Sequence, residues 1–500
     1  MNRRNFLASS VAAALAASLP IGRLLAAGAG VPVAGDVAAV TGAGAATTLE
    51  RAALQELRDS LRGALLLAGD PGYDQARRVL NESINKHPAL IVQPSGVADI
   101  RNAVNFARER SLLLAVKCGG HSPGGKSTCE GGMQIDLSHF RSARVDPVAR
   151  RAYVAGGSLL GEMDHEAMAF GLVTTAGTVS HTGIGGLTLG GGFGRLARRF
   201  GLALDNVKGV DVVTADGQLL HADAKENKDL FWGVRGGGGN FGIVTEFEFG
   251  LHPMQRQIIG GNLVFPFERA RELLAFYADY SSSVPDDMYV DFFMSLPPGG
   301  KPGGCGIHVC YSGGSAGEAE KLLAPARKLG TPLADTIKAQ DYVAIQRSTD
   351  RSDPRNEGTY LKSGFISDFK GSMIDALIDG FRPDPARATI VFFQHSGGAI
   401  GRVATDATAF PHRHSKNNMF AVVSWNLDND SAPHTRFIKD YWATLEPFTD
   451  GYYTNEVADE AQGIIDQNYQ GNIGRMRRLK YKYDPGNLFR LNANVLPSAA

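Results

Sequence analysis

The chain has 500 residues, which is long enough for two domains that each bury a hydrophobic core. Its 51 basic and 51 acidic residues balance, so the charge does not point to nucleic acid or an anionic membrane as a partner. Glycine is frequent, at 61 residues, yet it follows no collagen-like period, and the hydrophobic share of 43% is ordinary. The composition therefore predicts a globular protein rich in loops.

Residues 1–30 have the features of an export signal. Arg3 and Arg4 precede a weakly apolar, alanine-rich stretch that ends in small residues. The pattern predicts a twin-arginine signal peptide, recognition by the twin-arginine export machinery, and a periplasmic or secreted location. A membrane anchor is the less favoured alternative because Pro20 and Arg23 interrupt the stretch, and no stable membrane anchor is predicted. Residues 31–46, rich in Gly, Ala and Val, are predicted to be a flexible leader.

The four cysteines are too few for a disulfide framework and lack zinc-binding spacing. Cys305 and Cys310 lie an odd number of residues apart in an apparent strand, so they should point to opposite faces. Cys118 and Cys129 flank a glycine-rich loop. Two small buried thiols are the favoured interpretation there, and a disulfide is the alternative. The group His412–His414 does not fit a tetrahedral metal site, and is interpreted as a solvated turn or, less favoured, a pocket rim. No metal is predicted.

Two short buried strands precede the first glycine-rich loop. The segments 88–94 (PALIVQP) and 112–116 (LLLAV) are apolar, and a helical pattern with Val97, Ile100 and Val104 on one face lies between them. The loop KCGGHSPGGKST, residues 117–128, follows the second strand directly. Bare backbone in such a loop can come close to a phosphate group or a flat ring.

Two more glycine-rich segments follow, AGTVSHTGIGGLTLGGGFG at 176–194 and LFWGVRGGGGNFGIVTEFEF at 230–249. Apolar residues such as Ile184 and Phe193 stand between the glycines, whereas solvated linkers carry serine and charge instead. The segments therefore indicate a flat ligand that lies against bare backbone.

The pattern of residues changes after Pro253. Strand-like alternation predicts an antiparallel sheet with helices on one side, a substrate-binding domain over 254–460. The strands are expected at 288–296, 306–311, 388–396 and 419–425, with a helix at 316–329. The last forty residues are predicted to form an amphipathic helix, a turn at 484–486 and a closing strand.

Together these motifs resemble those of the berberine-bridge-enzyme-like FAD-linked oxidases, which share the vanillyl-alcohol-oxidase fold. KCGGHS matches the family's R-x-G-G-H-S loop, with Lys117 where arginine is usual. The segments TGIGGLTLGGGFG, DLFWGVRGGGGNFGIVT and NYQGNIGRMRRLKYKYDPGNLF match three further family motifs, and the likeness runs from about Gly72 to Val495. It implies an α+β fold, with a two-part PCMH-type FAD-binding domain at 47–253 completed by 461–500.

The resemblance implies one FAD, bonded covalently to His121. Many members add a second bond from a cysteine in G-x-C-P-x-x-G, but Val179 stands at that position here, so a single link is expected. That single link makes an oligosaccharide substrate doubtful. Further cofactor contacts are expected from Lys117, Cys118, Gly119, Gly120, Ser122, Gly124, Gly125, Val179, Thr182, Gly183, Gly185, Gly186, Leu189, Gly192, Phe193, Gly242, Ile243, Val244, Tyr469 and Asn472.

The implied reaction is hydride transfer from a CH–OH or CH–NH group of a small substrate to the flavin, followed by electron transfer to O2, which gives H2O2. In the family, a bulky residue just before G-x-G-G shields the flavin from O2, and the small Thr182 stands there. In GYYTNEVADE, Glu456 replaces a family tyrosine and is the expected catalytic base. Tyr453 is the alternative if the strand register differs by one.

Other functions stay open at this point. They are a periplasmic FAD dehydrogenase with a non-oxygen acceptor, a flavin-carrying binding protein without turnover, and a nicotinamide enzyme. The last is weakly supported because the glycines lack a strand–GxGxxG–helix unit with an acidic residue about 20 positions further on. The substrate could be a sugar, a secondary or phenolic alcohol, or a cyclic amine.

Overall fold

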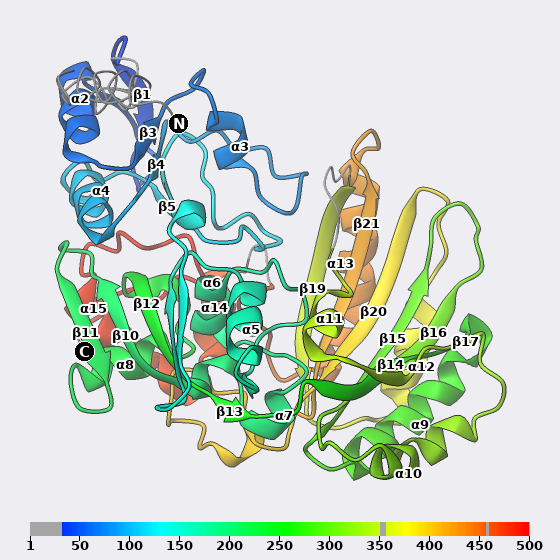
Figure 1. Ribbon diagram of the computed structural model, residues 1–500. Coiled ribbons are helices and arrows are strands. Elements are labelled where there is room, and N and C mark those ends of the chain that lie inside the picture. The colour runs from blue at the N-terminus through cyan, green and yellow to red at the C-terminus, as the bar shows by residue number, and fades with distance from the viewer. Residues whose placement is uncertain (1–32, 351–356, 457–459, 500) are drawn as a thin grey trace, which may run out of the picture.

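The computed structural model describes residues 33–350, 357–456 and 460–499. The predicted signal peptide lies outside the described residues. The chain forms two halves side by side, with the N- and C-terminal segments in one half and the middle of the chain in the other (Figure 1). Its mixture of helices and antiparallel sheets confirms the predicted α+β fold. Within the described residues, no helix is both long and apolar enough to cross a membrane.

The first sheet has the order β3-β4-β6-β5, with β4 and β5 both parallel to β6. Its strands β4 and β5 and the intervening helix α4 are those predicted, and Ile100 and Val104 of α4 are fully buried against it. The strands and helices of this region are β3 (Ala64–Leu66), β4 (Leu90–Gln93), β5 (Leu114–Lys117), β6 (Met133–Asp136), α2 (Arg51–Ser60), α3 (Tyr73–Arg77) and α4 (Val97–Glu109).

The flexible leader predicted for 31–46 is wrong for its described part. Strands β1 (Val37–Val40) and β2 (Ala46–Leu49) form an antiparallel hairpin. The hairpin is held to the first sheet region because Val40 N–H donates to the Gly131 carbonyl and Leu113 N–H donates to the Val40 carbonyl. Val33 is also buried. The small apolar residues here pack against the core of the first sheet region instead of forming a linker.

The second sheet is antiparallel, with the order β11-β10-β12-β8-β7. The C-terminal segment packs into the core of this sheet through Tyr469, Met476, Leu479 and Val495. The elements of this half are β7 (Ala143–Asp146), β8 (Arg151–Ala155), α5 (Leu160–Met168), β9 (Leu172–Val173), α6 (Ile184–Gly190), α7 (Ala197–Phe200), β10 (Val207–Val213), β11 (Leu219–Asp223), α8 (Lys228–Val234), β12 (Ile243–Gly250), β13 (His252–Pro253), α14 (Gln462–Asn468) and α15 (Ile473–Tyr483).

The closing strand predicted at the C-terminus is wrong. After α15, the described residues 484–499 form no strand. The buried carboxylate of Asp484 accepts hydrogen bonds from Leu488 N–H, Phe489 N–H and Lys480 Nζ, so local contacts satisfy this backbone without a sheet partner.

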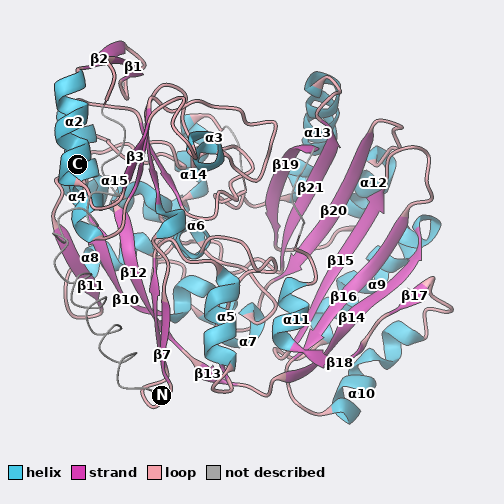
Figure 2. Cartoon of the chain, turned by 45° about the horizontal axis from the view of Figure 1, so that its top comes forward, coloured by secondary structure: helices cyan, strands magenta, loops and turns pink. Residues whose placement is uncertain are grey.

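The third sheet has eight strands, in the order β17-β14-β16-β15-β20-β21-β19 with β18 also beside β14. Helices α9, α10, α12 and α13 pack against one face of this sheet and form a single hydrophobic core with it, as predicted (Figure 2). Its elements are β14 (Gln257–Pro266), α9 (Ala270–Ser283), β15 (Met288–Leu296), β16 (Gly304–Tyr311), α10 (Ala316–Arg327), β17 (Ala334–Asp335), β18 (Lys338–Asp341), α11 (Tyr342–Arg347), β19 (Glu357–Ile366), α12 (Gly371–Gly380), β20 (Arg387–His395), β21 (Asn417–Asn426) and α13 (Ser431–Leu445).

The cysteines are all free. Cys305 packs into the helix-covered core and Cys310 into a cluster on the other side of β16, which confirms their opposite orientation. Cys118 and Cys129 form no disulfide, so that alternative is wrong.

The interpretation of His412–His414 as a solvated turn is also wrong. His412 is buried against Asn468, and burial lowers its pKa to about 4. Arg413 is fully buried and pairs with Asp205 at 2.8 Å. Only His414 is exposed. The described residues hold no cluster of metal-ligating side chains here or elsewhere.

Candidate active site

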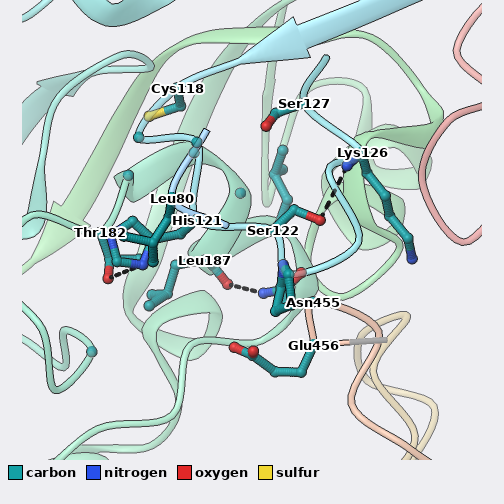
Figure 3. A pocket seen from close by; sticks show the side chains of 18 of the residues that line it. Leu80, Cys118, His121, Ser122, Lys126, Ser127, Thr182, Leu187, Asn455 and Glu456 are labelled. Atoms are coloured by element: carbon teal, nitrogen blue, oxygen red, sulfur yellow. Dashed lines mark hydrogen bonds between the residues drawn. The ribbon is translucent and has the colours of Figure 1, made fainter. Parts of the chain in front are cut away.

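A cavity of about 440 Å³ lies where the glycine-rich loops meet the face of the large sheet that is opposite helices α9, α10, α12 and α13. One side is made by the segments 118–127, 177–189 and 238–244, of which the second runs into α6 and the third into β12, and the other side is made by strands β19 to β21. The segment 453–456 adds side chains at its edge, and Figure 3 shows several of these residues around the open space.

The loop after β5 and the loop before α6 touch through their backbones. A Cβ atom added to Gly119 would lie 2.4 Å from Gly183 N, and one added to Gly183 would lie 2.3 Å from Gly119 N. No side chain fits at such a distance, so both positions require glycine for the loops to approach this closely. The glycine pair that ends the buried strand thus serves to join two loops of the cavity.

His121 lies two residues after Gly119, and His181 lies two residues before Gly183. The two histidine side chains lie against one another. His121 Nε2 is 2.6 Å from His181 Nδ1. The other nitrogen, Nδ1, is 3.3 Å from Thr182 Oγ1, a contact visible in Figure 3. All three residues line the cavity and are partly exposed to it. His121 therefore presents an imidazole to the cavity from a loop that is fixed in place.

Bare backbone forms the cavity wall at other points as well. Gly186 and Gly238 both line the cavity, and a Cβ atom added at either would meet no protein atom closer than 4.0 Å. Gly238 and Gly242 also have positive φ values, +65° and +150°. Open space where side chains would otherwise stand is what a large flat ligand needs, so these residues fit a flavin dinucleotide.

Most of the predicted cofactor-binding residues line this cavity: Cys118, Gly119, Gly120, Ser122, Val179, Thr182, Gly183, Gly185, Gly186, Leu189, Phe193, Gly242, Ile243 and Val244. The structure does not bring the following predicted residues to it: Lys117, Gly124, Gly125, Gly192, Tyr469 and Asn472.

Three of the residues that lie away from the cavity make contacts inside the protein. Lys117 Nζ donates to the Ala76 carbonyl at 2.6 Å and pairs with Asp136, and its burial lowers the pKa of the amine. Asn472 Nδ2 donates to the Thr405 carbonyl at 2.9 Å, and the Tyr469 ring lies in the core of the second sheet. The polar atoms of Lys117 and Asn472 are thus bonded within the protein, and the buried Tyr469 hydroxyl has no hydrogen-bond partner among the described residues.

The two candidate bases both reach the cavity, although not by the strand alternation that the sequence suggested. Residues 451–453 have no strand pairing, and a turn follows in which Glu456 N–H donates to the Tyr453 carbonyl. A turn places residues three apart on the same side, so Tyr453 and Glu456 line one cavity together. The prediction that the strand register would let only one of the two face the site is therefore wrong.

Tyr453 and Glu456 differ in their hydrogen bonding and in their pKa. Tyr453 Oη accepts hydrogen bonds from Gly192 N–H and from Asn455 Nδ2, both at 2.9 Å, and burial raises the pKa of this phenol far above its ordinary value. Burial raises the pKa of Glu456 to about 7, with Lys126 acting in the opposite direction. The carboxyl is therefore the group that can gain and lose a proton near neutral pH.

Sequence reasoning missed His181 and the apolar side of the cavity. His181 stood inside a segment that was interpreted only as a glycine scaffold. The apolar side comprises Leu361, Phe392, Phe420 and Val422 from β19, β20 and β21. Alternation in β20 and β21 could have divided their side chains into two faces, but it does not show which face meets the cavity.

Comparison with known proteins agrees with this arrangement. A family model described as an FAD binding domain matches residues 88–223, and one described as berberine and berberine like matches residues 452–496. An FAD-linked oxidoreductase of Dictyostelium discoideum is 32% identical over 449 residues, which cover 89% of this chain and 97% of that protein. The (R)-6-hydroxynicotine oxidase of Paenarthrobacter nicotinovorans is 27% identical over 463 residues, which cover 88% and 98%.

The fold has close structural neighbours. A crystal structure of 6-hydroxy-D-nicotine oxidase from Arthrobacter nicotinovorans superposes with a TM-score of 0.81 at 26% identity, covering 88% of this chain and 99% of that one. The cavity and fold thus define an FAD-dependent oxidoreductase. The chain belongs to the berberine-bridge-enzyme-like family of FAD-linked oxidoreductases.

The contact between the two loops makes a direct prediction. Gly183→Ala would place a methyl group 2.3 Å from Gly119 N and 2.4 Å from Cys118 Sγ, so the loops must separate. Such overpacking costs about 1–3 kcal/mol, and we expect a lower Tm and a lower ratio of FAD to protein. Gly463→Ala is the control, because a Cβ atom there meets nothing within 4 Å. Wild-type Tm and FAD content in Gly183→Ala would contradict the role of this contact.

Proposed function

We propose that the protein is an oxidase that takes a hydride from a CH–OH or CH–NH group of a small organic substrate and delivers the electrons to O2. The observation that carries the proposal is Glu456, a carboxyl with its pKa raised to about 7, in the same cavity as the glycine-lined cradle. FAD, when bound, supplies the hydride acceptor.

Glu456 would accept the proton that the substrate O–H or N–H loses as its neighbouring C–H bond is oxidised. None of the described residues donates a hydrogen bond to its carboxylate, whereas Tyr453 Oη already accepts two. A base that works near neutral pH needs a pKa close to that pH, and burial gives Glu456 this property.

The side of the cavity that the large sheet forms favours a compact, largely apolar substrate. Leu361 pairs with Val422 across neighbouring strands, and the Phe392 and Phe420 rings stack with centroids 4.5 Å apart. Two polar side chains of the cavity lining are bonded within the protein: Asn81 Nδ2 donates to the Pro123 and Thr359 carbonyls, and Gln394 Oε1 accepts from Asn418 Nδ2. An oligosaccharide would leave its many hydroxyls without partners against this wall, which favours a small alcohol or cyclic amine.

We also propose that FAD is bonded to His121 and to no second residue. Support comes from the position of the His121 ring in the cavity and from Val179, which lines the cavity but carries no group that can bond to FAD. Export by the twin-arginine route to the periplasm or beyond belongs to the same proposal, and its support is the Arg3–Arg4 pair and the apolar stretch after it.

The covalent link makes a prediction that needs no substrate. After acid denaturation, yellow flavin should stay with the protein, and peptide mass mapping should find it only on the peptide that contains His121. His121→Ala should release its FAD in acid while still binding it in the native state, because the glycine-lined walls are unchanged. Flavin that leaves the denatured wild-type protein, or that maps to a cysteine peptide, would contradict the single link.

The base assignment predicts how one substitution changes flavin reduction. Glu456→Gln keeps the shape of the side chain and removes the proton acceptor, so reduction by substrate should slow by ~10²–10⁴-fold. In the wild type the reduction rate should rise as pH increases through about 7, because the carboxyl must lose its proton first. This pH dependence should vanish in the variant. Stopped-flow absorbance measures both rates.

Glu357→Gln is the matched control, because Glu357 is the other carboxylate in the cavity lining but lies on its exposed side. Its reduction rate should stay within a few-fold of wild type. A wild-type reduction rate in Glu456→Gln would end the assignment.

The choice of O2 as acceptor predicts a role for the size of residue 182. Thr182→Leu should slow reoxidation of the flavin by air and leave reduction by substrate nearly unchanged, because a larger side chain would occupy the cavity beside His121. Thr182→Val, of equal size, separates bulk from loss of the hydroxyl and should reoxidise like the wild type. If air reoxidises the wild-type flavin far more slowly than artificial acceptors do, the protein is the alternative, a dehydrogenase.

A further inference from the structure

A buried polar cluster lies where α11 of one half packs against α5 of the other, behind one wall of the cavity (Figure 2). Gln346 of α11 is only 2% exposed. Its Nε2 donates to the carboxyl of Asp164 on α5 at 3.2 Å and to the Gly177 carbonyl at 2.9 Å, and its Oε1 accepts from Arg195 at 2.7 Å. One glutamine side chain therefore makes three contacts across the boundary between the halves.

The partners of Gln346 fix the orientation of its amide. A guanidinium group only donates and a backbone carbonyl only accepts, so Oε1 must face Arg195 and Nε2 must face Gly177. Arg195 Nε also donates to Nε2 of His308 on β16 at 3.0 Å, which leaves the proton of that ring on Nδ1, 2.8 Å from Asn262 Oδ1. Burial and the charge of Arg195 lower the pKa of His308 to about 3, so this ring stays neutral.

The cluster bonds the backbone of a segment that forms part of the cavity wall. Gly177, Thr178 and Val179 all line the cavity. The Gly177 carbonyl accepts from Gln346, and the Thr178 carbonyl accepts from Arg195 at 3.2 Å and from the hydroxyl of Thr349 at 2.6 Å. The position of this wall is thus determined by side chains that belong in part to the other half of the protein.

We propose that Gln346 is a positioning residue that holds the 177–179 wall at a fixed separation from the large sheet and so sets the gap in which a substrate meets the flavin. The wall and the strands β19 to β21 line the same cavity, and Gln346 joins the two sides without lining it. Its effect on substrate oxidation rests on the oxidase function proposed above, whereas its effect on the surroundings of the flavin does not.

One substitution would make this contact sensitive to pH. In Gln346→Glu, two carboxyl groups would meet where Gln346 and Asp164 are now 3.2 Å apart. A shared proton can join two carboxyl groups, whereas two carboxylates repel each other. Burial raises the pKa of Asp164 to about 7, so the change from one state to the other should fall near neutral pH. The wild-type amide can donate to Asp164 in either state.

The other titratable groups around the contact do not produce this difference. Arg195 stays cationic and His308 stays neutral near pH 7. Burial raises the pKa of Tyr342 well above its ordinary value and that of Cys310 to about 11, so both keep their protons. Burial also raises the pKa of Asp291 to about 7, but Asp291 titrates in wild type and variant alike. Each variant is therefore compared with the wild type at the same pH.

The experiment compares full-length, flavin-loaded wild type, Gln346→Met and Gln346→Glu at about pH 6 and about pH 8.5, on the two sides of the expected change. Visible circular dichroism reports the surroundings of the bound flavin and needs no substrate. Stopped-flow reduction by 1-phenylethanol and by pyrrolidine gives a rate constant and an apparent Kd. Gln340→Met is the matched control, because Gln340 of β18 donates to the Gly260 carbonyl of the neighbouring strand β14, within the large sheet.

We expect the variants to keep their FAD. Gln346→Met should change the flavin circular dichroism at both pH values and slow reduction by ~10–10²-fold with an apparent Kd within a few-fold of wild type, because a small displacement at a reacting site lowers the rate steeply. Gln346→Glu should approach the wild type at the acidic pH and differ from it at the alkaline pH. Gln340→Met should match the wild type throughout.

A wild-type spectrum in Gln346→Met, loss of FAD from both variants, or a Gln346→Glu difference that is equal at both pH values would each overturn the positioning role. If Gln346→Met does not fold, the pH comparison of Gln346→Glu decides. A wild-type flavin that neither donor reduces would count against the oxidase proposal instead, and the circular dichroism would still decide the role of Gln346.

Discussion

The contact between the backbones of Gly119 and Gly183 is the constraint on which the site depends. It joins a loop that follows a buried strand of one sheet to a loop that precedes a helix on the other. A side chain at either position would lie at least 0.6 Å inside the shortest separation, about 3.0 Å, that real Cβ atoms show. Because the loops cannot shift without losing this contact, His121, His181 and Thr182 are held in one cluster.

The large sheet completes the site from the opposite side. Strands β19, β20 and β21 present an apolar surface to the cavity, while their other face packs against helices. The turn at 453–456 then adds one carboxyl at the edge of this apolar surface. In the proposed reaction, the burial that would bind an apolar substrate also raises the pKa of Glu456, so substrate binding and proton transfer would share a physical cause. Tyr453, more deeply buried and bonded to Gly192 and Asn455, serves to hold this turn.

Much of the fold could be predicted because its signals are local. Alternation placed β15 and β20 within a residue of their observed ends, and the helical pattern of Ile100 and Val104 placed α4. These local signals gave wrong predictions where tertiary contacts determine the structure. The hairpin of β1 and β2 depends on backbone bonds to Gly131 and Leu113, and the irregular C-terminus depends on Asp484. For the site, motifs located the loops, but the partner of His121 depends on a contact between residues 64 positions apart.

The most direct test of the account is anaerobic mixing of the flavin-loaded protein with small secondary alcohols, phenolic alcohols, cyclic amines and oligosaccharides, followed by admission of air. For an oxidase with this site, we expect that a small alcohol or amine bleaches the flavin absorbance, that air restores it, and that one H2O2 appears for each reduced flavin. A flavin that none of these donors reduces would contradict an oxidase and leave a flavin-carrying binding protein. Rapid reduction by oligosaccharides alone would contradict the apolar site described by Leu361, Phe392, Phe420 and Val422.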